Sequence, residues 1–168
     1  LPAVKCKQVI DKDVAAGADA LLKGVITNGT GTTGIRGQAG FYKNAAGKTG
    51  THEGHQQSWF VGYTTKLATA VYVGTPITAY EMTGSHACIG GRCYGNVFGG
   101  TIAAPLWGQI MNDITVGMPD ESFPAPSSKI MYGDLVGVPS VIGMSVPNAI
   151  ATLRAAGLQT RPYRAYVP

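Results

Sequence analysis

The sequence predicts an α+β fold in which an antiparallel sheet packs against helices, with a small α/β module appended. Short segments of alternating apolar residues follow one another between about residue 40 and residue 74, and a helical pattern of apolar residues lies on either side of them. Glycine is abundant and only 13% of the residues are charged. Such a composition is typical of a folded chain with many tight turns rather than of a disordered one.

The first predicted helix begins at Asp13, which we expect to be its N-cap, and ends at Asn28 and Gly29. Its apolar residues recur at the spacing of one helical face. They are Val14, Ala18, Leu21, Leu22 and Val25. We expect this stripe to face the core, and the hydroxyl residues and glycines of residues 30–34 to form a polar loop.

Three extended segments follow the first helix, the first ending at Thr51 and the others covering residues 58–63 and 67–74. In the third, Thr69, Val71 and Val73 alternate with smaller or polar residues, as expected of a strand with one buried face. Only residues 64–66 separate the second segment from the third, which is short enough for a hairpin. The segments are therefore predicted to be consecutive antiparallel strands.

A closing helix is predicted from Thr101, as its cap, to about Val116, with Pro105 tolerated in the first turn. One face of this helix should be apolar. Its members are Leu106, Ile110, Met111 and Ile114. We expect Trp59 and Trp107 to fill the core between the sheet and this helix.

Prolines mark a boundary after the closing helix, because a fixed φ and the absence of periodicity argue against a packed element. The prediction is a first domain of residues 1–117, a linker of residues 118–135 and a small module of residues 136–168. In that module residues 138–144 are predicted to be extended. A helix should follow, capped by Ser145 and stopped by Gly157.

Several function classes are disfavoured by the sequence. The formal charge of +4 is spread along the chain, so we expect no nucleic-acid partner. Gly47, Lys48 and Thr49 suggest a phosphate loop, but Tyr42 stands where that loop needs a glycine, and no cofactor is expected.

No stretch is long and apolar enough to span a membrane. The chain lacks an initiator methionine, so we expect a fragment of a longer protein, with any export signal or membrane anchor upstream.

The cysteines and histidines leave alternatives open. Cys88 and Cys93 bracket a loop whose glycines would let the two thiols face each other, which favours a disulfide. A zinc site with His86 lacks a fourth ligand, and two free thiols are the third interpretation; Cys6 stands alone. His52 and His55 lie in a polar turn without a third ligand, so no metal site is predicted there.

Lys48, Thr49, Gly50 and Thr51 form the candidate binding site. Their extended segment presents a cation, two hydroxyls and a glycine that allows a ligand backbone to come close. Lysine attracts an anion, threonine hydroxyls can hydrogen-bond it, and exposed strand amides can stabilise an oxyanion. The residues therefore suggest an edge that binds carboxylates, although a strand end with a solvated lysine would give the same pattern.

The wider context resembles a known family. Segments in the same order resemble the helix and loop before the third conserved motif of penicillin-binding transpeptidases, then that motif, the strands after it and the closing helix. They are residues 22–31, 46–51, 59–64, 70–74 and 101–107. Residues 138–145 and 156–158 resemble the first strand and helix of a PASTA module. The combination is similar to actinobacterial class A penicillin-binding proteins and implies the end of the transpeptidase fold shared with serine beta-lactamases, followed by a partial PASTA module.

This resemblance implies a mechanism. In the family a serine attacks the D-Ala-D-Ala end of a peptidoglycan stem peptide, and beta-lactams are trapped on the same serine. Lys48 would hold the substrate carboxylate, Thr49 and Thr51 would hydrogen-bond it, the Thr51 amide would supply half of the oxyanion hole, and Gly50 would keep the edge open.

The sequence contains neither the Ser-x-x-Lys nor the Ser-x-Asn motif. We therefore expect the nucleophile on an upstream portion of the same domain, no activity in this chain alone, and a location on the outer face of the cytoplasmic membrane. The alternative is a PASTA-type module that binds peptidoglycan without catalysis.

Overall fold

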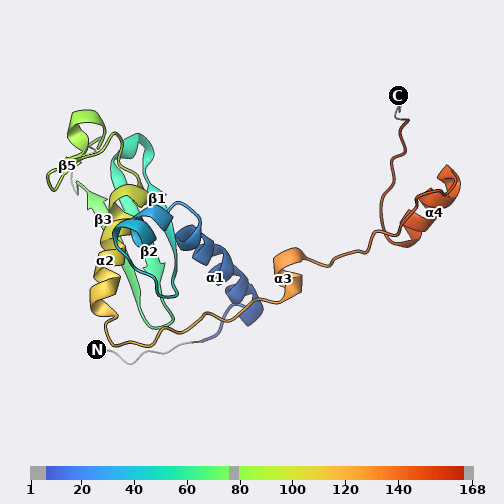
Figure 1. Ribbon diagram of the computed structural model, residues 1–168, viewed down its shortest axis with the longest axis horizontal. Coiled ribbons are helices and arrows are strands. Elements are labelled where there is room, and N and C mark those ends of the chain that lie inside the picture. Colours follow the sequence, from blue (N-terminus) through green and yellow to red (C-terminus); the bar gives the residue numbers. More distant parts are fainter. Residues whose placement is uncertain (1–6, 76–79, 165–168) are drawn as a thin grey trace. The chain divides into compact units, whose positions relative to one another are not determined.

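A computed structural model describes residues 7–75 and 80–164, so Cys6 lies outside the described part. The chain forms two compact units, unit 1 (Leu1–Ser127) and unit 2 (Ser128–Pro168), shown in Figure 1. Their junction falls inside the predicted linker of residues 118–135. The assignment of the flanking segments to particular domains stays a prediction.

Unit 1 is built on an antiparallel sheet in the order β1-β2-β3, formed by β1 (Ala46–Thr51), β2 (Gln57–Tyr63) and β3 (Ala68–Gly74). This confirms the predicted consecutive strands. Alternate residues are buried on one face, with Phe60 paired to Val71 across β2 and β3. The hairpin closes where the Thr64 amide donates to the carbonyl of Leu67 at 2.8 Å.

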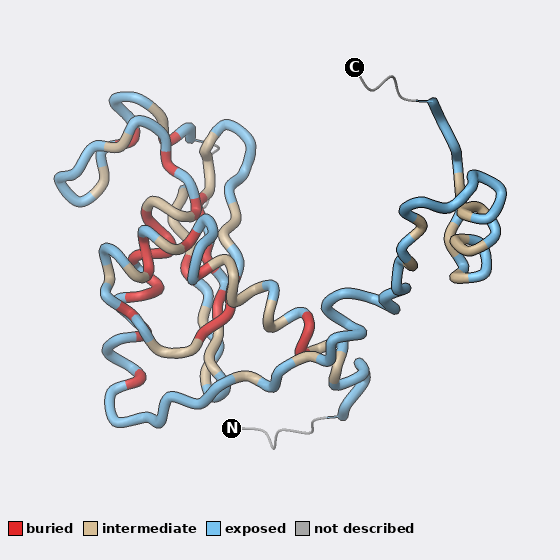
Figure 2. The backbone as a smooth tube through the Cα atoms, turned by 45° about the vertical axis from the view of Figure 1, so that its right-hand side comes forward, coloured by how far each residue is buried: buried red, intermediate tan, exposed pale blue. Residues whose placement is uncertain are grey.

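Helices pack against this sheet, so the predicted α+β fold with an antiparallel sheet packed against helices is confirmed for unit 1. α1 (Lys12–Thr27) contacts β1, while α2 (Ala104–Ile114) contacts β2 and β3 and follows the short turn η4 (Gly99–Ala103). Trp107 of α2 is fully buried, with ring centroids 5.4 Å from Phe41 and 5.1 Å from Phe60. In Figure 2 the buried positions, drawn in red, all lie in unit 1.

The start and the buried face of α1 differ from the prediction. Asp11 is the N-cap, and its carboxylate accepts hydrogen bonds from the amides of Asp13 and Val14. Val14 and Leu21 of the predicted core stripe are 48% and 72% exposed. The buried residues of α1 are Ala16, Gly17 and Ile26. The buried residues in the first half of α1 are small, Ile26 near its end belongs to the core, and Val14 and Leu21 are left outside.

The buried face of α2 also differs. Thr101 does not cap it; its hydroxyl lies 2.7 Å from both the amide and the carbonyl of Phe98 in the preceding turn. Leu106, Ile110 and Ile114, expected inside, are 39%, 41% and 41% exposed. The side that is buried carries Ala104, Pro105, Trp107, Gly108 and Met111. Pro105 lies in the first turn, as predicted.

Trp59 was expected in the core and is 37% exposed. It lies between two buried residues of β2, Ser58 and Phe60, and strand alternation therefore directs it to the opposite face. There its ring is 4.6 Å from that of Tyr72.

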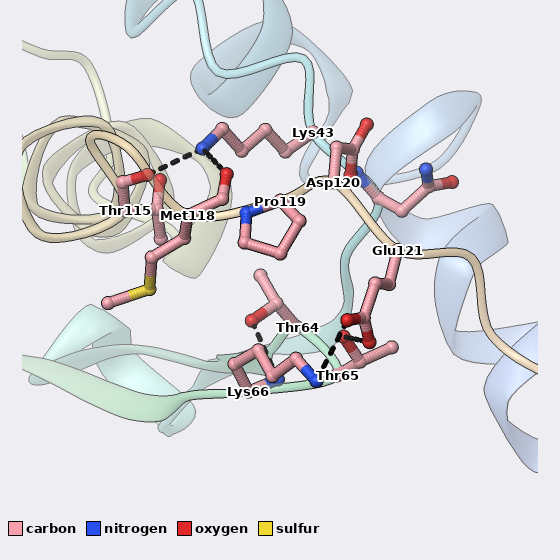
Figure 3. A pocket seen from close by; sticks show the side chains of 10 residues that line it. Lys43, Thr64, Thr65, Lys66, Thr115, Met118, Pro119, Asp120 and Glu121 are labelled. Atoms are coloured by element: carbon pink, nitrogen blue, oxygen red, sulfur yellow. Dashed lines mark hydrogen bonds and ion pairs between the residues drawn. The ribbon is translucent and has the colours of Figure 1, made fainter.

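The segment after α2 is held on unit 1 by polar contacts (Figure 3). Lys43 Nζ donates to the carbonyls of Thr115 and Met118, at 2.5 and 3.0 Å. Glu121 forms an ion pair with Lys66 at 2.8 Å, and the hydrogen bond from Lys66 lowers the pKa of the Glu121 carboxyl. The first part of the predicted linker thus docks on the segment before β1 and on the turn between β2 and β3 instead of standing free.

The same segment ends at α1. The Ser127 amide and hydroxyl donate to the two carboxylate oxygens of Asp13, at 2.6 and 2.5 Å. These bonds lower the pKa of Asp13, the bond from the Ser127 hydroxyl contributing most.

Unit 2 contains α3 (Ser128–Tyr132) and α4 (Val146–Ala155), and none of its described residues, 128–164, is buried. Ser145 precedes α4, as predicted, but its side chain makes no capping hydrogen bond. Gly157, at φ 78°, ends the helix as predicted. Residues 138–144 pair with no strand among the described residues, although a strand was expected there.

Tyr63 provides a test of how α1 is held to the sheet. Its hydroxyl donates to Asp19 of α1 at 2.5 Å, and burial, together with the Asp19 carboxylate, raises its pKa to about 12. An unfolded tyrosine ionises near pH ~10, so the unfolded state loses its proton first. Stability from this contact should therefore be complete below pH ~10 and fall as the pH rises towards about 12. Thermal unfolding of the parent and of Tyr63→Phe across this pH range measures the effect. The melting temperature of the parent should fall more steeply with rising pH than that of Tyr63→Phe. An equal pH dependence of the two melting temperatures would contradict the prediction.

Candidate functional site

β1 forms one edge of the sheet, and its hydrogen-bonding direction can be assigned. Just beyond β1, the His52 amide donates to the carbonyl of Gln57 at 3.0 Å, in register with the β1-β2 pairing. Bonded and non-bonded pairs alternate along an antiparallel ladder, so the Gly50 amide also faces β2. The amides of Thr49 and Thr51 therefore face the opposite, outer edge.

Lys48 reaches the same outer edge. Its side chain is exposed, and its Nζ donates to the carbonyl of Thr49 at 3.0 Å. That carbonyl faces away from β2 by the same alternation. The ammonium group and the outward amides of Thr49 and Thr51 thus lie along one strand edge.

A groove of about 550 Å³ lies beside this edge. Its walls come from the loop after α1, from β1 and from the turn that precedes α2. The lining residues are Thr30, Thr33, Gln38, Thr49, Thr51, Phe98, Gly99, Gly100 and Thr101. Of the residues predicted from the sequence, the threonines of β1 line this groove, while Lys48 and Gly50 do not.

Hydrogen bonds hold the two β1 hydroxyls in the groove. The Thr49 Oγ1 lies 2.7 Å from the Thr30 Oγ1, and the Thr51 Oγ1 accepts a hydrogen bond from the Gly99 amide at 3.0 Å. Sequence reasoning did not place Thr30 or Gly99 in the site; both stand in polar, glycine-containing loops. Their place depends on contacts with β1 that are remote in sequence.

The turn before α2 lies directly on β1. A Cβ atom added to Gly99 would stand 2.5 Å from the carbonyl oxygen of Trp59 and 2.6 Å from that of Gly50. Only glycine permits this approach of backbone to backbone. Gly99 thereby allows this wall of the groove to lie against the sheet.

The histidines beside the site have structural contacts. His55 Nδ1 lies 3.1 Å from the carbonyl of Val97, and the His55 ring meets Phe98 edge-on at 4.6 Å. His52 is exposed, with its Nδ1 2.9 Å from the carbonyl of Glu53. Over residues 7–75 and 80–164, no group of three or more histidine, cysteine or acidic residues could hold a metal ion.

Cys88 and Cys93 form a disulfide across the short hairpin of β4 (Cys88–Ile89) and β5 (Arg92–Cys93). Both sulfur atoms are therefore engaged and cannot serve as zinc thiolates with His86. In the part of the chain that the structure describes, no helix has the length and apolar character of a membrane span.

The edge of β1 combines groups that suit an anionic, extended ligand. A cation, two outward amides and two hydroxyls can receive a carboxylate and the backbone of a peptide.

No family model matches the chain. Over 169 residues it is 30% identical to penicillin-binding protein 1A of Aquifex aeolicus (strain VF5), covering 89% of this chain and 21% of the relative. The chain is similar to part of penicillin-binding protein 1A. It is also 29% identical over 123 residues to the protein of that name from Neisseria flavescens, covering 73% of this chain and 14% of the relative.

A mycobacterial protein of the same name is also similar to the chain. Penicillin-binding protein 1A of Mycobacterium tuberculosis (strain ATCC 25618 / H37Rv) is 33% identical over 104 residues, covering 58% of this chain and 11% of the relative. The chain thus spans about a fifth or less of the length of these relatives. An antiparallel sheet packed against helices is consistent with part of the transpeptidase fold of penicillin-binding proteins.

Proposed function

We propose that this chain supplies the carboxylate-binding and oxyanion-stabilising strand of a serine-type D-Ala-D-Ala transpeptidase, which cross-links peptidoglycan stem peptides. The observation that carries the proposal is the edge of β1. There the Lys48 ammonium and the outward amides of Thr49 and Thr51 lie beside a groove lined by the hydroxyls of the same threonines. The similarity to penicillin-binding protein 1A supports this reading of the edge.

Each group has a role in binding the terminal dipeptide. Lys48 attracts the carboxylate of the D-Ala-D-Ala end, and the hydroxyls of Thr49 and Thr51 orient it by hydrogen bonds. The extended peptide adds to the free edge of β1 as a further strand. The outward amide of Thr51 donates to the oxyanion that forms when the peptide carbonyl is attacked, where a preorganised donor is most effective.

The nucleophile comes from another segment under this proposal. No serine of the chain is followed by lysine three positions later, and none stands in a Ser-x-Asn sequence. The partner is the upstream portion of the same domain, which carries the serine that stem peptides and beta-lactams acylate. The chain alone binds a carboxylate and performs no turnover.

The proposed location is the outer face of the bacterial cytoplasmic membrane. A disulfide such as Cys88–Cys93 persists in an oxidising compartment and is rare in the cytosol. The substrate, a peptidoglycan stem peptide, is found in that compartment.

Labelling with a fluorescent penicillin, read on a gel and by intact mass, tests the proposal. The chain alone should stay unlabelled, and a mixture with the upstream portion should be labelled on that portion. Lys48→Gln should slow labelling of the mixture at least about tenfold, because a charge-assisted hydrogen bond is worth roughly 1.5–3 kcal/mol. Lys12→Gln, which removes an exposed lysine of α1, should leave the rate unchanged. Covalent labelling of the chain alone, or equal rates for the two variants, would overturn the assignment.

A second candidate function has one observation in its favour. In unit 2 an apolar groove of about 360 Å³ lies between α4 and residues 159–162, with Ile150 and Leu153 on one side and Arg161 on the other. A PASTA-type module would use such a surface to bind peptidoglycan. If the mixture is never labelled, wall binding by unit 2 becomes the better account.

A further inference from the structure

A second hollow lies next to the groove of β1. It has a volume of about 240 Å³ and is bounded by the hairpin of β4 and β5 on one side and by the start of α2 on the other. Gln38, at the end of the turn η1 (Thr33–Gln38), lines both this hollow and the groove. The groove and the hollow therefore share one lining residue.

The lining of the hollow combines an apolar side with one cation. Ile102 and Pro105 are buried and contribute apolar surface, while the exposed Arg92 and Gln109 supply polar groups. The ion pairs found among residues 7–75 and 80–164 are Lys66–Glu121 and Lys129–Asp134, and neither involves Arg92. Its guanidinium, 5.3 Å from the centroid of the Tyr94 ring, therefore has no carboxylate of the described chain as a partner.

The hairpin that carries Arg92 is well anchored. Arg92 pairs with Ile89 across β4 and β5, directly beside the disulfide-linked pair Cys88 and Cys93. The Tyr94 amide donates to the carbonyl of Ala87 at 3.0 Å, and Ala87 belongs to a small buried cluster with Val97, Met82 and Ile102. Arg92 is thus presented from a cross-linked hairpin fixed to its own core, so the hairpin loses little conformational freedom when a ligand binds.

We infer that this hollow is a second subsite, which binds an acidic peptide segment preceding the D-Ala-D-Ala end and receives a free carboxylate of that segment, such as the α-carboxylate of a γ-linked glutamate, on Arg92. The guanidinium offers two parallel donors to a carboxylate, and the apolar wall accommodates the methylene groups that carry it. The inference rests on the proposed function for the terminal dipeptide in the groove of β1. The second subsite adds a preference for negative charge in the part of the peptide that precedes the terminal dipeptide.

Three peptides separate the two subsites in a titration of the whole chain followed by amide-resolved NMR. N-acetyl-D-Ala-D-Ala probes the groove alone. N-acetyl-γ-D-Glu-L-Lys-D-Ala-D-Ala, with its α-carboxylate either free or converted to the amide, probes the hollow as well. In the parent chain the free acid should bind about fivefold tighter than the amide, the modest gain expected of a partly exposed ion pair.

Arg92→Gln should abolish the difference between acid and amide and leave the affinity for N-acetyl-D-Ala-D-Ala unchanged. Arg154→Gln is the matched control, since it removes one exposed arginine in unit 2 and should preserve the difference. Equal affinities of acid and amide for the parent, or a difference that survives Arg92→Gln, would overturn the second subsite while binding of the dipeptide still supports the proposed function. If the chain binds the free acid more tightly than the amide but does not bind N-acetyl-D-Ala-D-Ala, the proposed function is overturned and an anion site at Arg92 remains. Absence of all binding would overturn both.

Discussion

Replacing Trp107 by alanine is expected to lower the free energy of unfolding of unit 1 by about 4 kcal/mol, since removal of a buried aromatic side chain loses burial and leaves a cavity. Trp107 is fully buried and contacts the rings of Phe41 and Phe60. Gly62 of β2 lies directly against the indole, since a Cβ there would be 2.8 Å from it. Because glycine has no side chain, no small side-chain movement at this position fills the space. Urea unfolding followed by circular dichroism measures the effect.

Trp59→Ala is the matched control for Trp107→Ala. It removes the same side chain from the same unit, but Trp59 is 37% exposed and packs mainly on Tyr72. We expect a loss of about 1 kcal/mol, since a partly exposed ring on a sheet face leaves no closed cavity. Similar losses for the two variants would show that the core is not centred on Trp107.

The strands could be predicted from the sequence because their pattern is local. Alternation in residues 67–74 and the short link before them define a hairpin without reference to the rest of the chain. The helix faces could not be predicted in the same way. Leu21 is exposed and Gly17 is buried because α1 approaches β1 closely, and a hydropathy pattern ranks those two residues in the opposite order.

The candidate site shows the same division between local and long-range information. Lys48, Thr49 and Thr51 could be selected because a cation and two hydroxyls stand together on one predicted strand, and because the segments around that strand resemble a known family. The opposite wall, with Thr30 and Gly99, is brought to β1 only by folding. Trp59 was misplaced because sequence reasoning gave weight to its size, whereas its position between inward-facing residues of β2 decides its face.

The second large effect is expected at Gly99. Gly99→Ala should lower the free energy of unfolding by about 3 kcal/mol, at the upper end of what overpacking costs, since its Cβ would meet two backbone oxygens at 2.5 and 2.6 Å. Backbone atoms of a sheet cannot rotate away as a side chain can. The turn before α2 must therefore move off β1. This movement breaks the hydrogen bond from the Gly99 amide to Thr51 Oγ1 and changes the groove.

Binding and stability should consequently fall together in Gly99→Ala. Affinity for N-acetyl-D-Ala-D-Ala should drop at least about tenfold, the equivalent of roughly 1.4 kcal/mol, as the hydroxyl of Thr51 loses its fixed orientation. Gly95→Ala is the control: it lies in the same connection, and an added Cβ would meet nothing within 4 Å. It should leave both quantities unchanged. A Gly99→Ala variant that keeps the parent's affinity would mean that the distance between this turn and β1 does not control the groove. The carboxylate would then depend on the strand edge of Lys48, Thr49 and Thr51 alone.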